Sequence, residues 1–134
     1  MSQNAPADLD TAADQSGGKR QLLREKNRLA LLEATLESIA DKGIAETSVS
    51  EIIARAGLSR GMIHLHFGGK ENLVEAAAEL SNERYYEQLD RHLAASGERP
   101  QDKIVAIVRS DLSKDVLNTR NVSVWYAFRG EARK

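Results

Sequence analysis

The sequence contains no cysteine among its 134 residues, and only 4% of them are aromatic. The lack of cysteine excludes a disulfide scaffold, a zinc site built on thiolates and a cysteine nucleophile. No apolar run approaches the roughly 18 residues that a membrane helix needs, and the N-terminus lacks the basic and apolar stretches of a secretory signal. We therefore expect a soluble, cytoplasmic protein with no membrane partner.

The sequence also lacks the residue patterns of an enzyme. No nucleophile, base and orienting group stand in a recognisable arrangement, and no glycine-rich loop with a lysine and a hydroxyl could cradle a phosphate. His64 and His66 suggest a metal site, but residues two apart point to different sides of a helix. We predict that the chain is not an enzyme and that it holds neither a metal nor a cofactor.

The charge is unevenly distributed along the chain. Nineteen basic and 20 acidic residues give a net charge of −1, which by itself is evidence against a nucleic-acid partner. Residues 19–71, however, carry nine bases and seven acids, a local charge of +2, whereas residues 72–134 carry ten of each. Such a local excess fits a protein that contacts phosphate with one end only.

The chain divides into a short tail and a helical remainder. Residues 1–18 contain a single sizeable apolar residue, Leu9, so their burial cannot offset the entropy of ordering them, and we predict a disordered tail. From Lys19 onward, apolar residues recur every three or four positions, and no stretch shows the alternation of a strand. The predicted fold class is all-α.

The first predicted helix, residues 19–42, combines an apolar stripe with a basic beginning, and Gly43 ends it. The stripe consists of Leu22, Leu29, Leu32, Leu36 and Ile39. The basic side chains at its beginning are Lys19, Arg20, Arg24, Lys26 and Arg28.

Residues 48–67 predict two short helices joined by a tight turn. Ser48, with a glutamate three positions later, fits a capping box at the start of the first helix, and Gly57 ends that helix. Ser59 is a good N-cap for a second helix over residues 60–67. This arrangement is a helix-turn-helix, whose second helix enters the major groove of B-DNA.

The second helix carries the side chains that we expect to contact DNA. Arg60 and His64 lie four apart and share one face, and Gly61 between them lets the backbone approach the duplex. Arg60 suits bidentate pairing with guanine, worth about 1–3 kcal/mol of discrimination. Lys70 follows two glycines at a helix start, where free amides favour an anion, so we assign it to phosphate. Further phosphate or base contacts are expected from Ser48, Ser50, Ser59 and His66.

Residues 70–134 predict three more helices, over residues 70–95, over residues 100–117 and from residue 120 onward. The long first helix carries a row of glutamates that would repel DNA, so only its start can lie near phosphate: Glu75, Glu79, Glu83 and Glu87. The last helix carries Trp125, Tyr126 and Phe128. We interpret these aromatics as core residues or, alternatively, as a ligand group that offers cation–π contacts.

Residues 47–73 read TSVSEIIARAGLSRGMIHLHFGGKENL. This segment resembles the DNA-binding domain of the TetR family of bacterial one-component repressors. That family's pattern runs from a Thr or Ser cap through Ile-Ala-x-x-Ala-Gly-Val-Ser and Gly-x-x-Tyr-x-His-Phe to Lys-Glu-x-Leu. Here His64 replaces the tyrosine that contacts the DNA backbone, and Ile53 replaces a small alanine that lets the two helices approach.

The resemblance implies a three-helix DNA-binding domain over residues 19–69, followed by an incomplete helical ligand-binding and dimerisation domain over residues 70–134. It implies a transcriptional repressor that binds an inverted repeat of double-stranded DNA as a homodimer and is released by a small-molecule inducer. Through the motif, Thr47 and Met62 join the expected DNA contacts. Family members continue through further helices, so we expect a truncated product or a partial piece, whose own dimerisation stays open.

Three further stretches, ATLESI from Ala34, FGGK from Phe67 and WYAF from Trp125, look like the branch of this family that contains the choline-responsive repressors of betaine synthesis. That similarity implies a quaternary ammonium or other small polar inducer. Its expected contacts are Trp125, Tyr126 and Phe128.

Two other interpretations stay open at the level of the sequence. The chain could be a helical protein-interaction module that does not bind DNA, or a truncated regulator without function. A helical enzyme is a remote third possibility, because it would need residues beyond Lys134 to complete its site.

Overall fold

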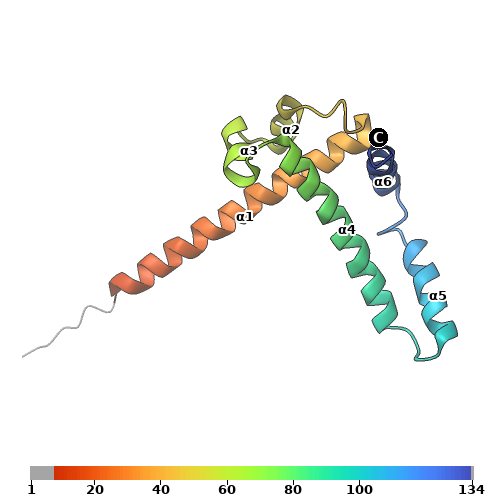
Figure 1. The fold of residues 1–134 in the computed structure, drawn as a ribbon. Coiled ribbons are helices and arrows are strands. Elements are labelled where there is room, and N and C mark those ends of the chain that lie inside the picture. The colour runs from red at the N-terminus through yellow and green to blue at the C-terminus, as the bar shows by residue number, and fades with distance from the viewer. Residues whose placement is uncertain (1–7, 134) are drawn as a thin grey trace, which may run out of the picture.

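The computed structural model describes residues 8–133, with side chains from residue 15 onward (Figure 1). Its helices are α1 (Asp8–Lys42), α2 (Val49–Ala56), α3 (Arg60–Phe67), α4 (Lys70–Ala94), α5 (Pro100–Asp111) and α6 (Thr119–Glu131). Residues 8–133 contain no strand, and the predicted all-α class is confirmed. In the same part of the chain, no helix is long and apolar enough to cross a membrane.

The main difference from the prediction lies in the first helix. α1 starts at Asp8 instead of Lys19, so residues 8–18 are helical where a disordered tail was predicted; residues 1–7 lie outside the described residues. The N-terminal half of α1 projects beyond the other helices (Figure 1). Leu22 and Leu29 are therefore 66% and 46% exposed, and the predicted apolar stripe is buried only from Leu32 onward. A helix extends readily once it is nucleated, because each further residue adds one hydrogen bond.

The core forms where the C-terminal half of α1 meets α2, α3, α4 and α6. Every one of these helices contributes at least one side chain with almost no exposure, which fixes the short helices α2 and α3 on the long ones. Removing such side chains from water supplies the main free energy of folding. The buried apolar side chains of this core are Leu31, Leu32, Ala34, Leu36, Ile39, Ile52, Ile63, Leu73, Ala77 and Val124.

α5 packs against α4 and leaves a large apolar face uncovered. Ala106 and Ser110 are buried. The helix ends at Asp111 instead of residue 117, and turns lead to Asn118, whose side chain caps α6 by accepting from the Asn121 backbone N–H at 3.0 Å. The exposed apolar side chains on and just after this helix are Ile104, Val105, Ile107, Val108, Leu112 and Leu117.

Candidate nucleic-acid interface and ligand groove

The turn between α2 and α3 sets the direction of the helix that carries the expected DNA contacts. Gly57 adopts φ 66°, and its N–H donates to the Ile53 carbonyl; glycine takes this left-handed conformation without steric cost. Ile63 is 2% exposed and holds the inner face of α3 against the core. The outer face, with Arg60 and His64, is exposed, as a helix that enters the major groove requires.

Arg60 and His64 are each held by one hydrogen bond. Arg60 Nη2 donates to Ser50 Oγ at 3.2 Å, which ties the beginning of α3 to the beginning of α2. His64 Nδ1 lies 3.2 Å from the Gly68 carbonyl oxygen, at the C-terminal end of α3. Gly61 between them is exposed, and a Cβ at this position would meet only one side-chain oxygen, at 3.8 Å. The backbone at Gly61 is thus open to a close approach.

The three serine candidates lie on the surface at the beginnings of α2 and α3. Ser48, Ser50 and Ser59 are all exposed. Ser48 Oγ accepts from the backbone N–H of Glu51 at 3.2 Å, which is one half of the predicted capping box. The Glu51 carboxylate pairs with two basic side chains instead of the Ser48 backbone. Phosphate contact by these hydroxyls stays a prediction.

Two of the expected DNA contacts are turned into the protein. Thr47 is 1% exposed; its hydroxyl donates to the Gly43 carbonyl at 2.8 Å and lies 3.1 Å from Ser38 Oγ. Met62 is half-buried and packs against the core. A buried hydroxyl with two partners cannot reach a phosphate, so the assignment of Thr47 to direct DNA contact was wrong. Its hydrogen bonds fix the turn between α1 and α2 instead.

His66 lies near the end of α3 and Lys70 is the first residue of α4; both are half-buried. Burial and the positive charges of Arg24 and Arg28 lower the pKa of His66, because both disfavour the protonated imidazole. Lys70 opens α4 directly after Gly69, and it takes part in no ion pair within residues 15–133. It is therefore available to a phosphate at this helix start.

An aromatic groove of about 570 Å³ lies between α4 and α6. All three tyrosines of the chain and its one tryptophan line it: Tyr85 and Tyr86 from α4, Trp125 and Tyr126 from α6. The ring centroid of Tyr85 lies 5.3 Å from that of Tyr86 and 6.1 Å from that of Trp125, with edge-on geometry, which is the favourable arrangement for aromatic pairs. Phe128 packs against the core, which confirms the core interpretation for this residue; it does not line the groove, so the alternative of a ligand contact was wrong for Phe128.

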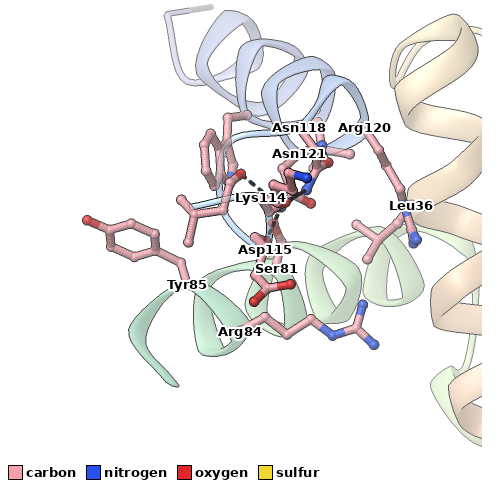
Figure 2. Close-up of a pocket in the computed structure, with 12 residues that line it drawn as sticks. Leu36, Ser81, Arg84, Tyr85, Lys114, Asp115, Asn118, Arg120 and Asn121 are labelled. Carbon is pink, nitrogen blue, oxygen red and sulfur yellow. Dashed lines mark hydrogen bonds between the residues drawn. The ribbon is translucent and has the colours of Figure 1, made fainter. Parts of the chain in front are cut away.

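A second, inner cavity of about 280 Å³ adjoins the groove, and Tyr85 and Trp125 line both. Figure 2 shows Arg84 of α4 and Arg120 of α6 at this cavity, with their guanidinium groups turned towards α1. There both donate to the carboxylate of Glu33, Arg120 at 2.6 Å. Partial burial of the Glu33 carboxylate raises its pKa, but the hydrogen bonds from the two arginines outweigh this effect and hold the pKa of Glu33 below its ordinary value. We call these three residues the Glu33 clamp; it joins α1, α4 and α6.

Tyr85, Tyr86 and the Glu33 clamp were not predicted from the sequence. Tyr85 and Trp125 stand 40 positions apart and Glu33 and Arg120 stand 87 apart, so no local pattern connects them. Two adjacent tyrosines in a chain with few aromatics were the available signal, but they indicate a groove only once the helix that faces them is known. Within the described residues, no group of three potential metal ligands occurs.

Comparison with known proteins agrees with this geometry. The sequence model of the family described as bacterial regulatory proteins, tetR family, matches residues 31–77, which include α2 and α3. Over these residues the chain is therefore similar to the regulators of the TetR family. HTH-type transcriptional regulator BetI 1 of Chromohalobacter salexigens is 35% identical over 101 residues, which are 75% of this chain and 50% of that protein. BetI of Stenotrophomonas maltophilia is 33% identical over 101 residues, 75% of this chain and 52% of that protein.

Two solved structures resemble this chain. A protein of Pseudomonas aeruginosa PAO1 described as a transcriptional regulator has a TM-score of 0.74 at 28% identity, over 82% of this chain and 53% of that one. A regulator of Streptomyces coelicolor has a TM-score of 0.70 at 30% identity, over 81% and 63%. These relatives are named as regulators and not as enzymes, in agreement with the prediction. The chain covers only about half the length of the curated relatives.

Proposed function

We propose that this chain is a member of the TetR family, that it is the DNA-binding part of a transcriptional repressor, and that α3 reads the major groove of its operator. The observation that carries this proposal is that α3 is buried on one side only. Ile63 is buried, while Arg60, Gly61 and His64 lie on the exposed face. In this proposal residues 19–69 form the DNA-binding domain and residues 70–134 begin the regulatory domain.

Phosphate contacts on both sides of α3 position it in the groove. Lys70 supplies a cation at the first turn of α4, and the exposed hydroxyls of Ser48, Ser50 and Ser59 supply hydrogen bonds beside the helix starts, the places where protein–DNA contacts to phosphate concentrate. Such contacts fix the register of the helix but do not read sequence. The protein acts in the cytoplasm as a homodimer, in which each copy reads one half of an inverted repeat.

The aromatic groove fits a small organic cation as inducer. Tyr85, Tyr86, Trp125 and Tyr126 present ring faces and edges to one space, and a cation over such faces gains about 0.5–2 kcal/mol. Carboxylates of α4 lie beside Tyr86 and favour positive charge. Arg129 also lines the groove, so a ligand with an oxygen acceptor next to its cationic group suits the site best. A quaternary ammonium alcohol has this chemistry.

Occupancy of the groove reaches the DNA-binding domain through the Glu33 clamp. Trp125 lines the groove and lies on the same helix as Arg120, which pairs with Glu33 of α1. A ligand that displaces Trp125 moves α6, and the clamp passes this movement to α1 and α4. Lys70, at the head of α4, then changes its position relative to the phosphate.

A selection from a random pool of DNA duplexes tests the proposed reading of sequence. The unmodified chain is expected to enrich a recurring half-site that contains a guanine. Arg60→Ala is expected to relax the preference at that guanine and to weaken binding of the best site by about 1–3 kcal/mol. Gln101→Ala, at an exposed and uncharged position of α5, serves as control. Enrichment of no sequence, or an unchanged guanine preference in Arg60→Ala, contradicts the proposal.

Quenching of the single tryptophan tests the ligand class. Choline is expected to change the emission of Trp125 saturably, while its uncharged carbon isostere dimethylbutanol has little effect, because cation–π attraction needs the charge. Equal responses to both compounds contradict a cation site.

The alternative from the sequence is a helical protein-interaction module that does not bind DNA. Binding to a protein partner that persists at high salt, without DNA binding, would favour this alternative.

A further inference from the structure

We propose that a row of three arginines on the projecting half of α1 is a second DNA-contact surface, which binds the phosphates that flank the site read by α3. This arginine row consists of Arg20, Arg24 and Arg28. The inference rests on the DNA binding proposed above. It extends this binding to the part of α1 before residue 31, where the family match begins.

The helix geometry places the three arginines on one side of α1. Residues four apart in an α-helix differ by about 40° around its axis, so Arg20, Arg24 and Arg28 span an arc of about 80° and a length of about 12 Å. Lys19 and Lys26 lie more than about 140° away from Arg24, on the opposite face. The basic residues at the start of α1 therefore lie on two opposite faces of the helix, and the arginines are confined to one of them.

Contacts with α3 show which way the arginine row faces. The guanidinium carbon of Arg28 lies 5.1 Å from the ring centroid of Phe67, the last residue of α3. Arg24 and Arg28 are also close enough to His66 for their charges to act on it. The row thus begins beside the C-terminal end of α3 and continues along the projecting half of α1, past the end of the folded core (Figure 1).

No carboxylate of the described residues neutralises the charges of the row. All three side chains are exposed, and none takes part in an ion pair within residues 15–133, whereas Arg55, Arg84 and Arg120 all do. Like charges four residues apart on a helix repel one another. Successive phosphates of one DNA strand, about 3.4 Å apart along the duplex axis, would relieve that repulsion and can occupy a row of this length.

Two double variants of the full chain separate the arginine row from a general charge effect. Arg20→Ala with Arg24→Ala removes two charges from the row and spares the contact of Arg28 with Phe67. Lys19→Ala with Lys26→Ala removes two charges from the opposite face of the same helix segment. Binding to a mixed-sequence duplex of roughly 30 base pairs, three helical turns, is measured by fluorescence anisotropy over a series of salt concentrations, and far-ultraviolet circular dichroism checks that each variant is folded.

The arginine variant is expected to bind about tenfold more weakly or worse. Its slope of log affinity against log salt should fall by about 0.9 for each phosphate that it no longer neutralises, up to about 1.8. The lysine variant should keep the slope of the unmodified chain. Equal slopes in all proteins, or equal decreases in both variants, overturn the arginine row while leaving the proposed function intact. Absence of DNA binding by the unmodified chain overturns both. If the arginine variant is less helical, the charge-preserving Arg20→Lys with Arg24→Lys must retain the slope.

Discussion

Replacement of Glu33 by glutamine tests the contact that joins the two parts of the chain. The carboxylate of Glu33 accepts hydrogen bonds from Arg84 of α4 and Arg120 of α6. The side chain of Glu33 is 29% exposed, that of Arg84 44% and that of Arg120 39%, so solvent screens both pairs. An ion pair of this exposure contributes about 0.2–1 kcal/mol, so two such pairs on one carboxylate predict a destabilisation of about 0.4–2 kcal/mol.

That destabilisation corresponds to a fall of roughly 1–8 °C in Tm for a chain of this size. The pH dependence has a definite sign, because the two arginines hold the pKa of Glu33 below its ordinary value of 4.5. The clamp stabilises the fold fully above the unfolded pKa, and this stabilisation is lost as the pH falls through the lowered native pKa. The difference between Glu33→Gln and the unmodified chain should therefore be present at pH 7 and shrink in acid.

Thermal unfolding followed by circular dichroism measures this difference. Glu25→Gln is the matched control, because Glu25 is an exposed carboxylate on the same helix without an ion pair in the described part of the chain. A double-mutant cycle with Arg120→Ala should show coupling, since the two changes remove the same interaction. An unchanged Tm at pH 7, or a deficit that persists in acid, refutes the reasoning.

Three further predictions concern the DNA-binding part. Thr47→Val should destabilise the fold by about 1–3 kcal/mol in urea unfolding, because it leaves Ser38 and the Gly43 carbonyl without their hydroxyl partner. Glu46→Gln, at an exposed neighbouring position, should change the urea midpoint much less. Gly57→Ala should cost about 1–2 kcal/mol, since φ 66° is strained for alanine, and an unchanged urea midpoint would contradict this. His66→Gln should remove part of the pH dependence of stability: the lowered pKa of His66 means that its contribution is present above about pH 6.5 and is lost as the pH falls through the native pKa, so identical pH profiles would contradict that role.

The helix-turn-helix could be predicted because its signals are local. Ser48, Gly57 and Ser59 each mark a helix end through their own backbone preferences, and the structure places the ends of α2 and α3 next to them. The periodicity of apolar residues then separates the inner from the outer face of α3. The exposure of Arg60 and His64 followed from that periodicity alone.

The remaining features depend on contacts between distant segments. Thr47 has the place of a surface cap in the motif, yet the packing of α2 on α1 buries its hydroxyl against Ser38. Trp125 and Phe128 stand on one short helix, but the position of α4 decides that Trp125 lines the groove and Phe128 joins the core. The apolar stripe of α1 is buried only where other helices pack against it. The spacing of its leucines therefore could not predict which of them are buried.

The most direct measurement of the central claim is the DNA affinity of the unmodified chain and of Lys70→Ala across a salt series. We expect binding that weakens linearly in log affinity with log salt, and a slope smaller by about 0.9 in Lys70→Ala, because this variant neutralises one phosphate fewer. DNA binding that is absent, or that does not change with salt and with Lys70, would contradict the account.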